Sequence, residues 1–151
     1  MVDFERARQA MVDCQVRPAD VTRYAIIQAM LSVPRERFVP RARREVAYAG
    51  TEIPIADSRV LLEPRVLAKM IEEAEVDARD LVLDLAPGTG SSTAVLAHIA
   101  EAVVAIEPED SLARLAQETL AALEVDNAAV STGDPALGDP AHGPFDVIFL
   151  N

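Results

Sequence analysis

The stretch DLAPGTGSS, residues 84–92, follows the apolar run at 81–83 and places two glycines two residues apart. An apolar run that ends in a glycine-rich turn is typical of a strand that meets a ligand-binding turn. Glycine suits such a turn because the backbone bends sharply and a Cβ would obstruct the ligand. Gly88 and Gly90 meet this requirement.

Strand and helix patterns alternate after residue 80. Short β-branched or apolar runs lie at 81–85, 102–106, 128–131 and 145–150. Helical patterns separate the first three of these runs, at 90–100 and 109–123. This alternation predicts a parallel sheet with right-handed crossovers, so we expect an α/β, doubly wound fold.

The residues before this alternation read mainly as helices. Residues 4–16 have a helical pattern, and Asp20 is expected to cap a second helix that Pro34 stops. A third helix is expected to begin near Pro64. The intervening stretch 45–62 has no regular pattern, so we expect it to be irregular.

Length and composition exclude several classes of protein. The chain has 151 residues, of which 50% are hydrophobic, enough to bury a core. Its amino terminus is charged where a signal peptide is apolar, and no run approaches the roughly 18 residues of a membrane span. We therefore expect a cytoplasmic protein with no membrane partner. Cys14 is the single cysteine and the two histidines are far apart, so we expect no metal site and a Cys14 packed in its helix.

Charge is distributed unevenly along the chain. Residues 1–69 carry 12 Lys and Arg against 9 Asp and Glu, whereas residues 70–151 carry 2 against 16, giving −11 in total. A short basic cluster lies at 34–44, with Phe38 as its only aromatic residue. Because the acidic bulk would repel phosphate, we expect a solvated basic face and no nucleic-acid partner.

Acidic residues follow each of the first three predicted strands. Asp84 closes the first strand, Glu107 follows the second and Asp134 follows the third, so the three carboxylates should share one edge of the sheet. A carboxylate after the second strand can accept both ribose hydroxyls, and Asp134 could reach an adenine amino group. The alternatives are a solvated acid for Glu107 and a turn residue for Asp134.

An adenosine-containing ligand is therefore favoured, and two classes of it compete. A dinucleotide turn requires Gly-x-Gly-x-x-Gly, whereas Thr93 stands at the third glycine position. Asp84 has no part in dinucleotide binding but suits a ligand with a cationic amino-acid end. The residues favour S-adenosylmethionine over a nicotinamide dinucleotide, which stays as the weaker alternative.

Several segments carry a family resemblance. VLDLAPGTGSSTAVLA (82–97) resembles the first motif of Rossmann-like S-adenosylmethionine-dependent methyltransferases. AIIQAMLSVPRERFVP (25–40), TEIPI (51–55) and EPRVLAKMIEEAEV (63–76) are similar, in order and spacing, to the protein-L-isoaspartate O-methyltransferase family. The resemblance implies a helical, substrate-side segment at 1–62 and a Rossmann-like donor-binding domain at 63–151.

The resemblance also implies a site and an activity. The residues that it assigns to the methyl donor are Asp84, Ala86, Gly88, Thr89, Gly90, Glu107 and Asp134. The family methylates the α-carboxylate of isoaspartyl residues in damaged proteins or peptides, which would be the partners of this chain. The acceptor oxygen is already an anion, so the enzyme mainly positions donor and acceptor.

Two departures from the family pattern concern the site. Ala86 stands where the family usually has glycine, and Pro87 after it lacks an N–H. Val60 and Leu62 stand where the family has Thr and Ser, whose hydroxyls face the reacting carboxylate. A non-catalytic module for ligand sensing or protein interaction is therefore the alternative function.

No catalytic residue can be assigned from the sequence, but three acceptor-side candidates remain. Arg59 or Arg65 could hold the carboxylate in place of the missing hydroxyls, while Glu63 would repel it. A third departure concerns length, because the family fold continues beyond the fourth strand. We expect an incomplete sheet with an open edge: either the chain is a fragment of a longer protein, or a second copy of the chain covers that edge. Asn151, at the end of the fourth strand, is expected near the transferred methyl group.

Overall fold

The computed structural model describes residues 1–151, which divide into two compact units, Met1–Glu75 and Val76–Asn151. The boundary falls after the helix α3 (Pro64–Glu73), not before it as the predicted division at residue 62 has it. The reason is that α3 packs against α2 (Tyr24–Ser32) and the π-helix η1 (Val12–Val16) of the first unit.

The second unit is built on a four-stranded parallel sheet. Its strands are β3 (Leu81–Leu85), β4 (Ala102–Glu107), β5 (Ala128–Thr132) and β6 (Val147–Leu150). The order is β5-β4-β3-β6, with Asp84 level with Ala105 of β4 and Phe149 of β6. The predicted α/β class and parallel sheet are thereby confirmed. The strand order also reverses between β3 and β6, and this is where doubly wound sheets bind ligands.

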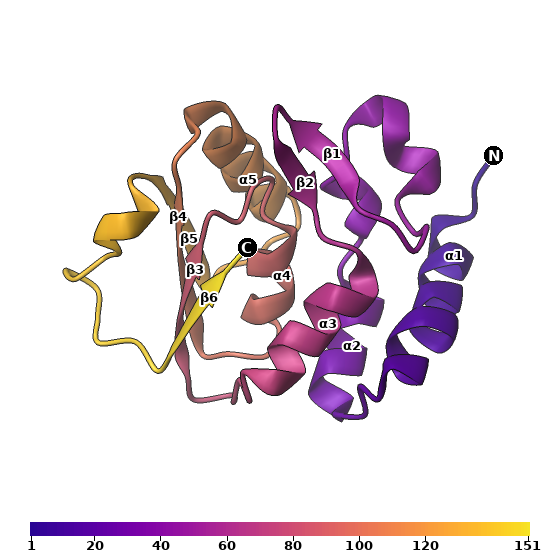
Figure 1. Ribbon diagram of the computed structural model, residues 1–151, viewed down its shortest axis with the longest axis horizontal. Coiled ribbons are helices and arrows are strands. Elements are labelled where there is room, and N and C mark those ends of the chain that lie inside the picture. Colours follow the sequence, from indigo (N-terminus) through magenta and orange to yellow (C-terminus); the bar gives the residue numbers. More distant parts are fainter. The chain divides into compact units, whose positions relative to one another are not determined.

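Helices cover one face of this sheet (Figure 1). α4 (Ser91–Ala97) and α5 (Asp110–Ala122) lie on the same face, and the short 3-10 helix η5 (Pro135–Leu137) lies on the other. The face of α5 that packs on the sheet is apolar, with Leu112, Ala116 and Leu120 buried. Both crossovers run in one direction from β3, which places their helices on one side. β5 and β6 are the edge strands.

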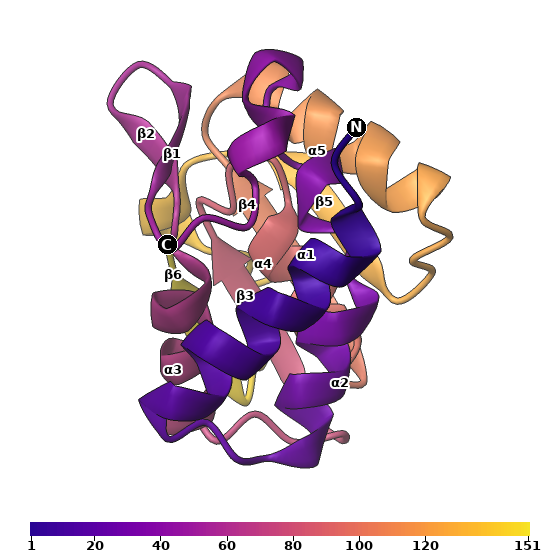
Figure 2. The same ribbon diagram turned by 90° about the vertical axis from the view of Figure 1, so that its right-hand side faces the viewer.

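The first unit is mainly helical, as predicted (Figure 2). α1 (Phe4–Met11) continues into η1 and the 3-10 helix η2 (Arg17–Ala19), and two further 3-10 helices follow α2, η3 (Arg35–Arg37) and η4 (Arg41–Val46). The cap prediction was wrong. Asp20 ends η2 with a left-handed φ of 63°, and α2 begins later, after Arg23.

The stretch expected to be irregular contains a β-hairpin. β1 (Ile53–Ala56) and β2 (Arg59–Leu61) pair antiparallel, with Ile53 opposite Leu61. Ser58 adopts a positive φ of 57° in the turn between them. The strands are three and four residues long, too short to show an alternating pattern in the sequence.

Buried polar contacts hold the first unit together across long sequence distances. Arg8 Nε donates to the Tyr48 hydroxyl at 2.9 Å, and that hydroxyl donates to the Glu36 carboxylate. Arg35, which is 3% exposed, donates to the carbonyls of Ala47 and Leu62 at 2.6 and 2.7 Å. Burial lowers the pKa of Arg35 to about 10 and raises that of Tyr48 to about 12.

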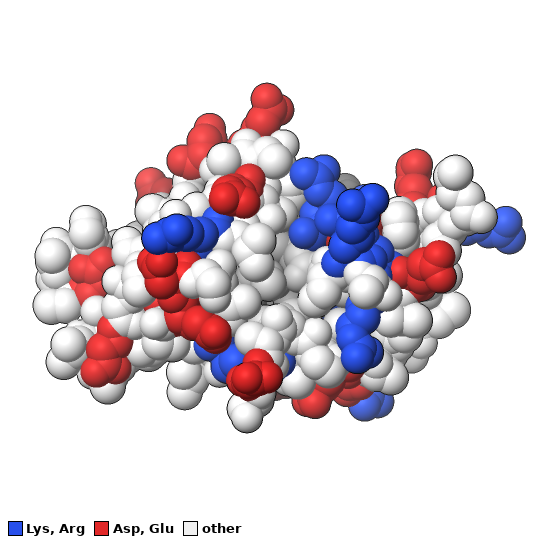
Figure 3. Space-filling view, turned by 90° about the horizontal axis from the view of Figure 1, so that it is seen from above, with Lys and Arg blue, Asp and Glu red and all other residues white.

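The charges also differ between the units. Residues 1–75 carry 12 basic and 12 acidic side chains, whereas residues 76–151 carry 2 and 13. In Figure 3, Lys and Arg side chains gather over the first unit and acidic side chains predominate over the second. Arg37, Arg41 and Arg43 of the basic cluster are exposed, as predicted for a solvated basic face.

No helix of the structure is long and apolar enough to span a bilayer.

Candidate functional site

The turn after β3 has the backbone that the glycine pattern predicts. Gly88 and Gly90 have φ values of 64° and 97°, and Gly90 leads into α4 at Ser91. Ala86 also has a positive φ, of 56°, and its N–H donates to the Ile106 carbonyl at 2.8 Å. An L-residue with a side chain is strained in this region, so Ala86 holds the turn at a cost that glycine would not incur.

Asp84 is fully buried beneath this turn and ties three segments together. Ser92 Oγ and Thr93 Oγ1 each donate to Asp84 Oδ2 at 2.8 Å, and Asn151 Nδ2 donates to Oδ1 at 2.6 Å. Burial raises the pKa of Asp84 to about 7; the three donors act against this shift, and the charge of Glu107 adds to it. The carboxyl group fixes the first turn of α4 and the end of β6 to β3.

Glu107 lies at the end of β4 and is also fully buried. Its Oε2 accepts the Gly88 N–H at 2.7 Å and its Oε1 accepts the Glu109 N–H at 3.0 Å. The alternative of a solvated acid is therefore wrong for this structure. The hydrogen bond between Gly88 and Glu107 shows that the turn after β3 and the end of β4 lie side by side, at the edge of the sheet that was predicted for both.

The remaining predicted donor residues differ in burial. Thr89 is 7% exposed, within the turn. Asp134 is exposed, and its Oδ1 accepts the Ala136 N–H at 2.9 Å as the N-cap of η5. The neighbouring Gly133 N–H donates to the Glu107 carbonyl at 3.1 Å. The backbone thus connects the Asp134 segment to Glu107, while the Asp134 side chain caps a turn.

Three polar residues of this site were not predicted as members of it. Ser92 and Thr93 enter through their hydroxyls, and Asn151 through its amide. Two adjacent hydroxyl residues in the first turn of a helix, after a strand that ends in an acid, are a signal that could have identified the first two. Asn151 was expected near the transferred methyl group, but its contact with Asp84 was not predicted, because only the strand order places β6 beside β3.

The acceptor-side candidates lie in the first unit. Arg59 is half-buried in β2, and Arg65 Nη2 pairs with Glu63 Oε1 at 3.0 Å at the start of α3. Val60 is 42% exposed. Leu62 offers its carbonyl to Arg35 Nη2, so this position contributes backbone rather than a hydroxyl. No group of three or more His, Cys, Asp or Glu side chains is arranged to hold a metal ion.

Comparison with known proteins identifies the family. The model of the protein-L-isoaspartate(D-aspartate) O-methyltransferase family matches residues 6–151. The chain belongs to this family. Protein-L-isoaspartate O-methyltransferase 1 of Syntrophobacter fumaroxidans is 35% identical over 150 residues, which cover 99% of the chain and 70% of that relative. The predicted resemblance is confirmed.

Solved structures of the family share the fold. A protein-L-isoaspartate O-methyltransferase superposes with a TM-score of 0.79 at 23% identity, over 97% of this chain and 47% of that one. A second, from Plasmodium falciparum in complex with S-adenosyl-L-homocysteine, has a TM-score of 0.77 at 15% identity, over 99% and 73% of the two chains. The chain spans 60–70% of the length of the curated family relatives that it matches.

Proposed function

We propose that the protein transfers the methyl group of S-adenosylmethionine to the α-carboxylate of isoaspartyl residues in damaged proteins or peptides. The observation that carries the proposal is a pair of buried carboxylates at the switch point of the sheet, in a chain of this family. Glu107 holds the turn 86–90 through the Gly88 N–H, and Asp84 holds the first turn of α4 that follows it. S-adenosylhomocysteine, the demethylated product of such a donor, is bound in the Plasmodium falciparum relative.

Glu107 fits the role of ribose acceptor. Its two oxygens accept the Gly88 and Glu109 N–H groups, and a carboxylate at the end of the second strand of such a sheet is placed to accept ribose hydroxyls. The two N–H donors also fix the rotamer of the side chain before a ligand arrives. Because Glu107 is fully buried, the proposed contact requires the covering turn to move when the donor binds.

Asp84 is a positioning residue in this proposal. It receives Ser92, Thr93 and Asn151, so it sets the first turn of α4, whose N–H groups favour an anionic ligand group such as the methionine carboxylate. Above pH about 7, where Asp84 is ionised in the folded protein, its charge also favours the positively charged amino group of the donor. Gly88 and Gly90 let the backbone approach the donor closely.

The chemistry requires positioning more than proton transfer. The bound donor supplies a methyl group on a positively charged sulfur, and the acceptor carboxylate is already an anion. The chain must therefore hold the carboxylate in line and exclude water. Val60 and Leu62 offer no hydroxyl for this purpose, so we assign the contact to an arginine, Arg59 or Arg65, of which Arg65 pairs with Glu63.

The non-catalytic alternative has no support from the relatives, which are named as transferases. The cytoplasmic location, the second copy at the sheet edge and the absence of nucleic-acid partners stay predictions.

The function is tested with two peptides of one sequence, one carrying isoaspartate and one carrying aspartate. We expect the protein to form a base-labile methyl ester on the isoaspartyl peptide and none on the aspartyl peptide, measured by transfer of labelled methyl from S-adenosylmethionine. Donor binding in calorimetry without any ester would contradict the proposal.

A further inference from the structure

The basic cluster at 34–44 places four arginines on the surface of the first unit. Arg37 lies on η3, and Arg41, Arg43 and Arg44 lie on η4. The first three are exposed, and Arg44 is half-buried. These four residues form the arginine patch, and Figure 3 shows basic side chains gathered over this unit.

The backbone holds the patch in a defined conformation. The two short helices pack against each other, and the segment between them is anchored by Phe38, which is 2% exposed. The Arg43 N–H donates to the Pro40 carbonyl at 2.8 Å, at the start of η4. Residues three apart in a 3-10 helix lie on one face, so Arg41 and Arg44 are neighbours. A ligand would therefore meet guanidinium groups on an ordered backbone, which reduces the entropy lost on binding.

The carboxylate inside the basic cluster does not neutralise the patch. Glu36 is 9% exposed, accepts the Tyr48 hydroxyl and pairs with Arg8 at 3.3 Å. Glu45, which follows the patch in the chain, is exposed. Residues 36–45 thus present four basic side chains and one carboxylate to solvent, a local charge of +3.

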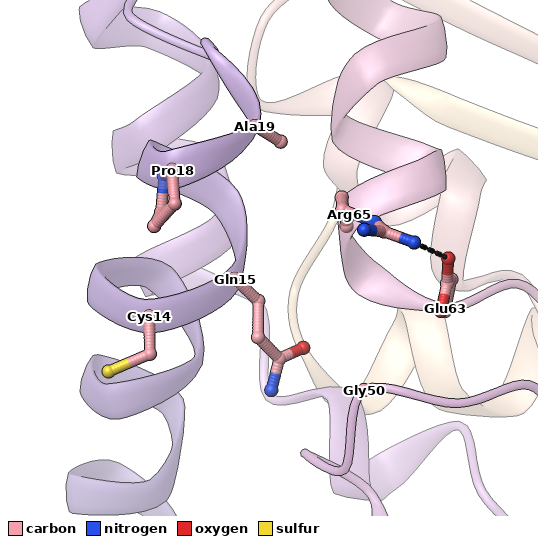
Figure 4. A pocket seen from close by; sticks show the side chains of 7 residues that line it. All are labelled: Cys14, Gln15, Pro18, Ala19, Gly50, Glu63 and Arg65. Atoms are coloured by element: carbon pink, nitrogen blue, oxygen red, sulfur yellow. Dashed lines mark hydrogen bonds and ion pairs between the residues drawn. The ribbon is translucent and has the colours of Figure 1, made fainter.

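Other basic side chains of the first unit have carboxylate partners. Arg17 pairs with Asp13 at 3.3 Å, and Arg65 pairs with Glu63 at 3.0 Å, as the dashed line in Figure 4 shows. None of the ion pairs of this unit includes a residue of the arginine patch. Arg6 in α1 is likewise exposed outside these pairs, but it is a single charge. Because neighbouring like charges repel, an anion that binds several patch arginines together also removes their repulsion.

The surroundings of the patch favour a carboxylate-rich polypeptide over a nucleic acid or a membrane. Phe38 is the only aromatic residue of the cluster and is buried, so no ring can stack on bases. The net charge of −11 would repel the dense phosphates of a nucleic acid, whereas a short acidic segment can contact the patch alone. Val46 is the one exposed large apolar side chain that adjoins the cluster, too little for insertion into a bilayer.

We propose that the arginine patch binds an acidic segment of a partner polypeptide, in which several Asp or Glu side chains lie close together. Each exposed guanidinium group can hold one carboxylate through two parallel N–H···O bonds. A protein substrate with such a segment would be a partner of this kind under the proposed function. Binding itself does not depend on that function, because it requires neither donor nor methyl transfer.

The probe is a fluorescein-labelled hexaglutamate peptide, and its binding to the whole chain is followed by fluorescence anisotropy. The affinity should fall at least about tenfold when the salt concentration rises from about 50 mM to about 500 mM, since exposed charges are screened. The triple variant Arg37→Gln, Arg41→Gln, Arg43→Gln should lower the affinity at low salt at least about tenfold, because it removes the exposed charges of the patch. A hexaglutamine peptide should not bind either protein.

The matched control removes three exposed arginines elsewhere. Arg6→Gln, Arg79→Gln, Arg114→Gln changes the net charge by the same amount and should bind hexaglutamate within about twofold of wild type. Thermal unfolding of both triple variants checks that each is folded. An equal loss of affinity in the two variants overturns the assignment, because net charge and not the patch would then be responsible.

Three further results would also overturn the proposal. The first is no binding of hexaglutamate at low salt. The second is tighter binding of a hexauridylate or of vesicles with anionic lipids, lost in the patch variant, which would assign the patch to phosphates. The third is a dimer at low salt, seen by light scattering in wild type and lost in the patch variant, which would make a second copy the partner. Failure of methyl transfer leaves all of these measurements unaffected.

Discussion

The regions that we propose for the methyl donor and for the methyl acceptor are assembled in different ways. In the second unit, Asp84 and Glu107 take their partners from Ser92, Thr93, Gly88 and Glu109, at most 19 residues away, with Asn151 as the one distant partner. In the first unit, Gln15 and Arg8 reach Tyr48 over 33 and 40 residues. A local motif can therefore specify the donor side, while the acceptor side depends on tertiary structure.

The two regions also differ in burial. Asp84 and Glu107 are fully buried, whereas Val60 is 42% exposed and the Arg65 side chain is 62% exposed. Changes at the buried carboxylates should alter stability and donor binding together, because each removes a hydrogen-bonded group from the interior. Changes at the exposed acceptor positions should alter the reaction and leave stability nearly unchanged.

The largest expected effect is the pH dependence of stability caused by Asp84. Its pKa is about 7 in the folded protein against an ordinary value of 3.8, so the folded state holds a proton that the unfolded chain releases in this range. The free energy of unfolding should therefore fall as pH rises from about 4 to about 7 and then level off. The raised pKa corresponds to a loss of at most about 4 kcal/mol in the free energy of unfolding over this pH range.

Asp84→Asn tests this origin by urea denaturation across that pH range. The substitution should remove the decrease, because the amide does not titrate. The matched control is Asp126→Asn at an exposed position, which should keep the wild-type pH profile. If the wild-type and Asp84→Asn curves run parallel, Asp84 is ionised throughout and the interpretation is wrong.

The next effect concerns donor affinity. Glu107→Ala should weaken S-adenosylmethionine binding at least about tenfold, or about 1.4 kcal/mol, because it removes the ribose acceptor and the group that holds the Gly88 N–H. Calorimetric titration measures the loss. Glu109→Ala is the control, since that side chain is exposed and its backbone N–H remains. Equal affinities for all three proteins would refute the ribose role.

The difference between the regions explains what the sequence could predict. All four strands of the second unit were predicted within two residues at each end. The central strands β3 and β4 are largely buried and read as continuous apolar runs, whereas the edge strands β5 and β6 were recognised from shorter apolar runs with exposed positions. The hairpin at 53–61 was missed, since its strands are short and half-exposed. Asp20 was misassigned because an acid before a helical pattern also fits the end of the preceding helix.

The candidate site follows the same division. The turn glycines and Glu107 could be placed from spacing alone, since strand ends of a parallel sheet share one edge. The contact between Asn151 and Asp84 could not, because it depends on the order of the strands in the sheet. Cys14 is exposed, contrary to the prediction that it packs in its helix, because it lies two residues from each of the buried Val12 and Val16 and so faces the other side of the helix.

A smaller effect is expected at the strained turn residue. Ala86→Gly should stabilise the protein by about 0.5–1 kcal/mol. The left-handed backbone of Ala86 costs about 1–2 kcal/mol, which glycine avoids, but glycine loses more conformational entropy on folding than alanine and so cancels part of the gain. Ala121→Gly, at an exposed helical position of α5, should destabilise it by a similar amount. Thermal unfolding of both variants measures the pair. The same sign for both would show that the turn relaxes without strain.

The smallest effect on stability is expected on the acceptor side. Val60→Thr restores the hydroxyl that the family resemblance places toward the carboxylate, at a position that is already 42% exposed. The free energy of unfolding should stay within about 0.5 kcal/mol. If the hydroxyl reaches the substrate, kcat/KM on an isoaspartyl peptide should rise about two- to tenfold, since one net hydrogen bond contributes about 0.5–1.5 kcal/mol. Val46→Thr, at another exposed valine outside the acceptor segment, should leave kcat/KM unchanged. A loss of activity in Val60→Thr would indicate that the hydrocarbon itself packs against the substrate, and that this side of the site has specialised for a different acceptor.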